Sequence, residues 1–237
     1  MKRDLRSYLQ FLEEELPNQI VYVDKVLDPS KFEVTAILQN LENLGKYPLT
    51  VFSKPLNLKG EISEFPIVTN VFASRDRCAV ALGLSPSESL LPLSLEYSRR
   101  EAKRVPPVVV SKDSAPVKDV IHTGEAVDLT AFPIVRHHRM DPAPYIDMTP
   151  ILKDPEDGFY NASFQRTMYV GPRKILIAMG PFHNWRIFRK YEERGRPAPV
   201  AIVVSHHPAF YLGVLNVAPF GADDYEVIGS IMGEPLR

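Results

Sequence analysis

The sequence predicts a mixed α+β protein in which a small α/β domain over residues 1–104 precedes an antiparallel sheet or barrel over residues 105–237. Before residue 104, segments with helical periodicity alternate with short β-prone segments, a pattern typical of α/β domains. Pro106-Pro107 marks a boundary, after which short β-prone segments are separated by Pro, Gly and Asp. The 22 prolines, roughly twice the usual share of about 5%, are spread along the chain and favour many short strands and turns.

In the N-terminal part, apolar residues at helical spacing locate helices, and β-prone runs between them locate strands. The first helix ends at Pro17, and the second ends at Gly45, a residue type common at helix C-termini. The expected helices cover residues 5–16, 28–45, 75–82 and 88–103, and the expected strands cover residues 20–26, 49–53 and 66–73. We assign the charged run at residues 99–104 to a solvated helix end rather than to a binding patch.

In the C-terminal part, the expected strands cover residues 108–110, 117–121, 132–135, 175–179 and 200–205. One inserted helix is expected around residues 185–195, and another at residues 225–231. Leu236-Arg237 would then begin a further element. We therefore expect the chain to be truncated, or its sheet to be completed by another segment or chain.

Composition excludes several classes of function. The net charge of −1 provides no field that would attract nucleic acid or an anionic membrane. The single cysteine, Cys78, excludes an internal disulfide framework and fits a reducing compartment. The N-terminus lacks the pattern of a signal peptide, and no stretch reaches the roughly 18 apolar residues that span a bilayer. The sequence predicts a cytoplasmic protein, and it contains no Walker, GxGxxG, GxSxG or CxxC motif.

The segment from Asp154 to Arg166 is the strongest local indication of a site. An Asp-Pro and Asp-Gly turn runs into a short apparent strand that carries Asn161, Ser163 and Gln165 at period two, and hence on one face. Amide, hydroxyl and guanidinium groups together suit an oxygen-rich ligand, either a phosphate or a metal-bridged one. A plain polar edge strand is an equally good interpretation of this segment alone.

Two further residues are candidates because of their places in the predicted elements. His183 lies where a strand leads into the inserted helix, a junction from which a side chain can project into a site. Asp224 belongs to the pair Asp223-Asp224 at a helix start, where N-terminal capping by the pair is the simpler interpretation. The histidine pairs at residues 137–138 and 206–207 are assigned to surface, packing or capping roles.

Five motifs in order resemble the UbiD family of decarboxylases, which use prenylated FMN. They are Asp128-Leu-Thr-Ala-Phe-Pro-Ile-Val, Asp141-Pro-Ala-Pro-Tyr-Ile, Asp154-Pro-Glu-Asp-Gly-Phe-Tyr-Asn161-x-Ser163-x-x-Arg166, Pro199-Val-Ala-Ile-Val-Val-Ser-His-His-Pro-Ala and Asp224-Tyr-Glu-Val-Ile-Gly-Ser-Ile-Met-Gly-Glu-Pro-Leu. The resemblance implies a split β-barrel that binds the flavin beside the N-terminal α/β domain. It also implies non-oxidative, reversible decarboxylation of an α,β-unsaturated or aromatic acid.

The resemblance also implies roles for individual residues. The residues expected to contact the cofactor are Asn161, Ala162, Ser163, Phe164, Gln165, Arg166, Phe182 and His183. Those expected to hold a divalent metal, usually Mn²⁺, against the cofactor phosphate are Asn161, His183 and Asp224, and K⁺ is an open alternative or additional ion. Arg166 is expected to be catalytic, near the substrate carboxylate.

The chain departs from the family pattern at three points. Asp224 stands where glutamate is usual, Phe182 stands where a polar residue often precedes the metal histidine, and family members continue beyond residue 237. The continuation carries an acidic catalytic motif and a C-terminal domain that mediates oligomerisation.

The resemblance therefore implies the N-terminal portion of a homo-oligomeric enzyme, supplied with cofactor by a flavin prenyltransferase. Two alternatives stay open: a half-site or non-catalytic subunit that needs a partner chain, and a plain FMN-binding split-barrel oxidoreductase.

Overall fold

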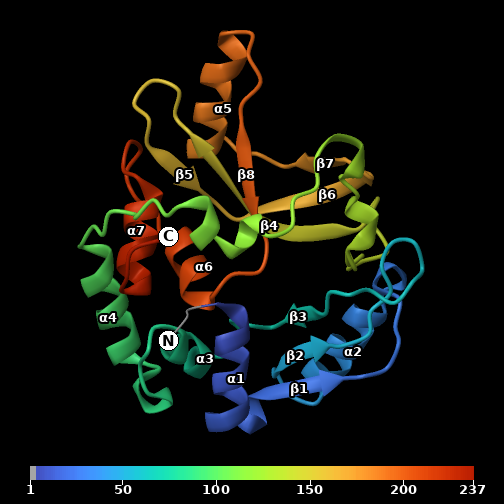
Figure 1. Ribbon diagram of the computed structural model, residues 1–237. Helices are drawn as coiled ribbons and strands as arrows, with labels where there is room; N and C mark the ends of the chain where they lie inside the picture. Colours follow the sequence, from blue (N-terminus) through green and yellow to red (C-terminus); the bar gives the residue numbers. More distant parts are fainter. Residues whose placement is uncertain (1–3) are drawn as a thin grey trace.

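The computed structural model describes residues 4–237, with residues 147–148 described by their backbone alone. The first three residues of the predicted N-terminal domain lie outside this range. Two sheets form two layers, a three-stranded one near the N-terminus and a five-stranded one above it in Figure 1. No helix in the described range has the length and apolar character needed to cross a bilayer.

The N-terminal layer is a small mixed sheet with helices. Strand β1 (Ile20–Val23) is parallel to β2 (Leu49–Phe52), which is antiparallel to β3 (Ile67–Thr69). The helices are α1 (Leu5–Glu15), α2 (Glu33–Asn43), α3 (Arg75–Ala81) and α4 (Leu91–Glu101). The predicted elements are present but shorter. For example, Phe32 takes a left-handed conformation with φ 65°, which separates the 3₁₀ turn Pro29–Lys31 from α2.

Two arginines tie helices to the rest of the fold. The guanidinium of Arg77 is buried and donates to the side chain of Gln19 and to the carbonyls of Tyr47, Asn70 and Val71. Arg100 donates to the carbonyls of residues 82 and 231, at 2.7 and 2.8 Å. The prediction that residues 99–104 form a solvated helix end is therefore wrong for Arg100, because its carbonyl partners lie on two other elements.

The C-terminal layer is an antiparallel sheet built around one long strand. Strand β4 (Tyr145–Lys153) pairs with β5 (Tyr160–Ala162), β6 (Gln165–Gly171) and β8 (Val200–Val203), and β6 pairs with β7 (Lys174–Ile177). β5 and β6 keep one register along β4, with Ile151 opposite Ala162 and Met148 opposite Gln165. The two strands are separated only at residues 163–164. Ser163 lies opposite Pro150, which has no backbone N–H to donate to the neighbouring strand.

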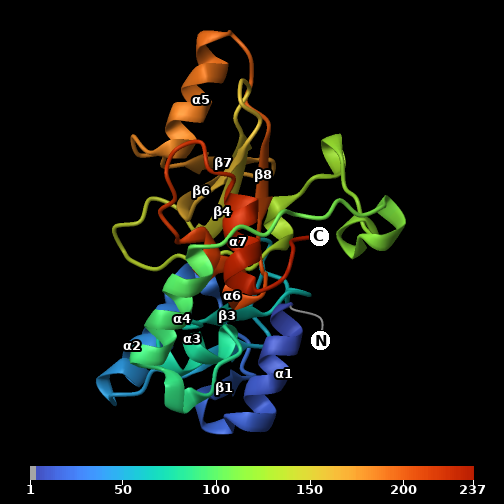
Figure 2. The same ribbon diagram turned by 90° about the vertical axis from the view of Figure 1, so that its left-hand side faces the viewer.

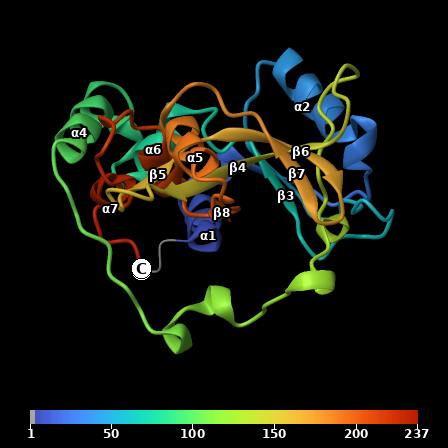
Figure 3. The ribbon, with the colours of Figure 1, turned by 90° about the horizontal axis from the view of Figure 1, so that it is seen from above.

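The sheet is open, since β5, β7 and β8 are not joined into a closed barrel in the described residues. The expected strands at 108–110 and 117–121 are absent from the same range, which instead holds 3₁₀ turns such as Pro116–Lys118. Figure 3 shows this segment running outside both layers. Helix α6 (Pro208–Val214), which was not predicted, begins where the Nδ1 atom of His207 accepts from the Ala209 N–H.

The two layers share one hydrophobic core. Its largest cluster joins Ala79 and Leu82 of α3 to Ile151 of the upper sheet and to apolar residues of α6 and α7 (Asp224–Met232). α6 and α7 pack closely, because a Cβ added at Gly213 would lie only 2.8 Å from the Cα of Ile228. Helix α5 (His183–Glu193) projects beyond the sheet, as Figures 1 and 2 show. The start of α5 and the start of α7 both contact the region where β5 ends and β6 begins: Asn184 bonds to Ser163, and Asp224 accepts from the Ala162 N–H.

Candidate functional site

A cavity of about 360 Å³ lies at the break between β5 and β6. Its walls are formed by this break, by the segment that leads into α5 and by the start of α7. Residues 214–218, at and after the end of α6, complete the lining. The predicted site residues that line it are Asn161, Ala162, Ser163, Phe164, Gln165, Phe182, His183 and Asp224. Residues from three separate parts of the sequence therefore meet at one cavity.

Asn161 and His183 face each other across this cavity. Asn161 is buried on β5, and its Oδ1 atom lies 3.2 Å from Nδ1 of His183, the first residue of α5. Burial and the neighbouring Arg186 cation lower the pKa of His183, so the imidazole is neutral near pH 7. Neutral imidazole is the form that binds metals.

Asp223 and Asp224 have different roles at the start of α7. Asp223 is the N-cap and accepts from the Tyr225 N–H at 2.8 Å. Asp224 instead lines the cavity, and its Oδ2 atom accepts from the Ala162 N–H at 2.8 Å. Burial raises the pKa of Asp224 to about 6, and the neighbouring Asp223 adds to the rise, while the Ala162 N–H and the Arg104 cation oppose it. The capping role considered for Asp224 belongs to Asp223.

This donor set fits a divalent cation. Ligands at right angles in an octahedral site with bonds of about 2.1 Å lie about 3.0 Å apart, close to the 3.2 Å between the Asn161 and His183 atoms. The Asp224 carboxylate, when ionised, would supply negative charge to such an ion. Gln165 also lines this wall, but its Oε1 atom is buried and has no hydrogen-bond partner among the described residues.

Arg166 lies beside the cavity and does not line it. It follows Gln165 on β6 and is exposed, whereas Gln165 is partly buried at the wall. Neighbouring residues on a strand point to opposite faces. The structure therefore brings the three predicted metal ligands together and leaves the predicted catalytic arginine outside.

Comparisons with known proteins identify the family. A sequence model of the 3-octaprenyl-4-hydroxybenzoate carboxy-lyase Rift-related domain, UbiD, matches residues 108–237, and the model of the corresponding N-terminal domain matches residues 10–94. The chain belongs to the UbiD family. The predicted family is thus confirmed.

Several relatives are similar to this UbiD-family chain. The anhydromevalonate phosphate decarboxylase of Methanothermobacter thermautotrophicus is 30% identical over 94% of this chain and 47% of the relative. The evolved dimeric form of the UbiD-class enzyme HmfF from Pelotomaculum thermopropionicum, solved in complex with prFMN, has a TM-score of 0.85 at 30% identity, over 99% of this chain and 51% of that one. The closed form of Sedimentibacter hydroxybenzoicus vanillic acid decarboxylase has a TM-score of 0.87 at 26% identity, over 100% and 50%. The chain spans about half the length of these relatives.

The sequence interpretation missed Asn184 in this UbiD-family site. Its side chain is 1% exposed, lines the same cavity and hydrogen-bonds to both Asn161 and Ser163, at 2.8 and 2.7 Å. Its position directly after His183 was the only available sequence signal. No local pattern distinguishes an inward-facing asparagine from a solvated one at a helix start.

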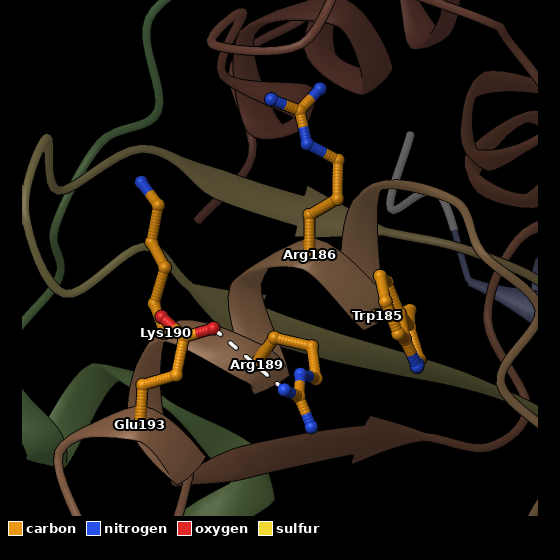
Figure 4. A pocket seen from close by; sticks show the side chains of 5 residues that line it. All are labelled: Trp185, Arg186, Arg189, Lys190 and Glu193. Atoms are coloured by element: carbon orange, nitrogen blue, oxygen red, sulfur yellow. Dashed lines mark ion pairs between the residues drawn. The ribbon is translucent and has the colours of Figure 1, made fainter.

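A second hollow, of about 350 Å³, lies on the outer face of α5 and holds none of the predicted metal ligands (Figure 4). Trp185, Arg186, Arg189, Lys190 and Glu193 line it, and Arg189 pairs with Glu193. The nearby acidic group at residues 154–157 is already compensated, since the Lys190 ammonium lies 2.7 Å from Asp154 and 2.8 Å from Glu156. Of these two hollows, the first is therefore the one that holds the predicted metal ligands.

Asp224 makes the stability of the metal-free chain pH-dependent. Its folded-state pKa of about 6 exceeds the ordinary value of 3.8. The stabilising protonated form is therefore fully present below about pH 4 and is lost as the pH rises through 6. We expect Asp224→Asn to be nearly neutral at pH 4 and to raise the free energy of unfolding at pH 7 by roughly 3 kcal/mol. Urea unfolding at both pH values checks this, and an equal effect at both would contradict it.

Proposed function

We propose that this chain carries the flavin and metal site of a carboxy-lyase that decarboxylates an α,β-unsaturated or aromatic carboxylic acid reversibly and without net oxidation. The observation that carries the proposal is the convergence of Asn161, His183 and Asp224 on one cavity, with donor atoms of the first two 3.2 Å apart. When bound, prenylated FMN would supply the electron sink for the loss of CO₂.

The chain's own residues would divide the work of binding. Asn161, His183 and Asp224 would hold Mn²⁺, since two oxygen donors and one imidazole suit that ion. Ser163 and Gln165 would hydrogen-bond the cofactor, and Ala162, Phe164 and Phe182 would contact it. K⁺ is proposed as an additional ion, and its position is not assigned because the acidic group at residues 154–157 is already paired with Lys190.

Native mass spectrometry tests the assignment. The chain would be coexpressed with a flavin prenyltransferase and supplied with Mn²⁺. We expect one mass increment for prenylated FMN and one for a single metal ion. A protein that carries plain FMN and no metal would favour the oxidoreductase alternative. A polypeptide that carries neither would contradict the proposal that these residues suffice to bind the cofactor.

Arg166 is proposed to orient the substrate carboxylate, as a fixed planar cation can. We expect Arg166→Ala to lower the turnover of the active holoenzyme by roughly 10²-fold or more, while the flavin stays bound. Arg173→Ala is the matched control, because Arg173 lies in the β6–β7 turn and pairs with the exposed Glu125. Wild-type turnover in Arg166→Ala would refute this role, and flavin loss would assign the arginine to binding.

A partner for the upper layer is also proposed. The relatives are about twice as long as the chain, and the segment at 108–121 exposes apolar side chains, with Val109 96% and Val117 79% accessible. These observations support completion of the site by a further polypeptide region or partner chain, with homo-oligomerisation of the complete enzyme. Copurification of a second polypeptide is the expected result, whereas a stable monomer that is fully active would argue against it.

We also propose residues 104 and 105 as the boundary between two sequence units. The family models end at residue 94 and resume at residue 108, on either side of it. The two units share a core, so they are proposed to fold together. The cytoplasm is proposed as their location because the single cysteine fits a reducing compartment.

A further inference from the structure

Asn184 connects the polar residues of the cavity through a hydrogen-bond network. Its Oδ1 atom accepts from Asn161 Nδ2 at 2.8 Å, and its Nδ2 atom donates to Ser163 Oγ at 2.7 Å and to the Pro150 carbonyl at 3.2 Å. Both N–H groups and the carbonyl oxygen of this amide therefore have partners. With a side chain only 1% exposed, Asn184 has no water-facing alternative.

The Pro150 carbonyl sets the direction of this network. A carbonyl oxygen can only accept, so the Nδ2 side of Asn184 must face Pro150. The Oδ1 side of Asn184 must then face Asn161, which has to present its own Nδ2 to it. The Asn161 Oδ1 atom is consequently turned toward His183, the direction in which it can bind a cation.

The same network directs the Ser163 hydroxyl. Asn184 Nδ2 and Gln165 Nε2 both donate to Ser163 Oγ, at 2.7 and 3.0 Å. Two donors use both acceptor positions of a hydroxyl oxygen, so its single hydrogen is left to donate elsewhere.

We propose that Asn184 is a positioning residue that sets the hydrogen-bond polarity of the cavity wall. It directs the Asn161 oxygen toward His183 and leaves the Ser163 hydroxyl hydrogen to donate toward the cavity. The wall thus presents an acceptor at Asn161 and a donor at Ser163. A matching ligand carries a cation beside an oxygen acceptor. The assignment to Mn²⁺ rests on the proposed function, whereas the orientation of the side chains does not.

The test compares Asn184→Leu with Ile187→Ala. Leucine has a similar size and removes every polar contact, while Ile187 is a fully buried residue one turn further along α5 that contributes nothing to the network. In the presence of FMN, we expect Asn184→Leu to weaken Mn²⁺ binding 10- to 100-fold, a typical effect of residues that orient a metal ligand. We expect Ile187→Ala to lower the free energy of unfolding at least as much as Asn184→Leu does. Its Mn²⁺ affinity should nevertheless stay within about threefold of wild type.

A metal-free readout separates this inference from the proposed function. In the ¹⁵N-labelled wild-type chain, we expect the side-chain NH₂ signals of Asn161 to be protected from solvent exchange. In Asn184→Leu that protection should be lost, whereas in Ile187→Ala it should persist. A wild-type chain that shows protected Asn161 signals but binds no Mn²⁺ would refute the metal site and leave the orientation intact. Unprotected Asn161 in wild type, or equal losses in both variants, would overturn the inference.

Discussion

Replacing His183 by alanine is expected to weaken Mn²⁺ binding by roughly 100-fold or more, because even residues that merely orient metal ligands contribute 10- to 100-fold. Among the described residues, His183 supplies the only imidazole that lines the cavity, 3.2 Å from the Asn161 oxygen. The variant would leave one amide oxygen and one carboxylate to hold the ion. Electron paramagnetic resonance of free Mn²⁺, with FMN present, measures the change directly.

His122→Ala is the matched control for this measurement, since His122 is exposed in the segment outside both layers. It should bind Mn²⁺ as the wild type does. His183→Ala should lower the free energy of unfolding by only about 1 kcal/mol, because the side chain loses its contacts with Asn161 and Phe220 while the backbone of α5 is unchanged. Wild-type Mn²⁺ affinity in His183→Ala would refute the assignment of this residue, whatever the activity of the protein.

Replacing Arg77 by methionine is expected to lower the free energy of unfolding by roughly 2–4 kcal/mol, the range typical of a broken buried network. The Arg77 guanidinium donates to Gln19 and to three backbone carbonyls from the segments flanking β2 and β3. Methionine fills the same space and leaves these acceptors without donors. Burial lowers the pKa of Arg77 without neutralising it, so the cost of burying a cation is already part of the wild-type fold.

Arg75→Met provides the control for Arg77. It lies two residues earlier on α3 and also donates to carbonyls, those of Ser89 and Leu90, but it is exposed. Water can replace its contacts, so we expect a loss of less than about 1 kcal/mol. Urea unfolding of both variants measures the two losses in the free energy of unfolding. Equal losses would mean that burial of the guanidinium is not what makes Arg77 important.

The sequence predicted those elements whose signals are local. Helices α1, α3, α5 and α7 follow helical periodicity and end signals that lie within a few residues of each helix. Period-two spacing predicted that Asn161, Ser163 and Gln165 share a face, and the hydrogen bonds through Asn184 confirm it. The three side chains remain on one face across the break at residues 163–164, because β5 and β6 keep one register along β4.

The wrong predictions concern pairing between distant segments. Residues 108–110 and 117–121 have β-prone composition but no partner strand in the described residues. Strand β4 was missed although it pairs with three others, in part because Pro150 interrupts its pattern. A strand is stabilised by neighbours far away in the sequence, so composition alone cannot show whether those neighbours exist.

The sequence by itself determined the family, every named helix except α6, and the side chains that share the Asn161 face. Only the tertiary structure decided that Asp223 caps α7 while Asp224 lines the cavity, that Asn184 joins the network, and that Arg166 stays outside the cavity. Residue type and spacing specify what a side chain can do within its own element. Which neighbours it meets depends on how β5, α5 and α7 pack together, and that packing depends on hydrophobic clusters whose members are far apart in the sequence.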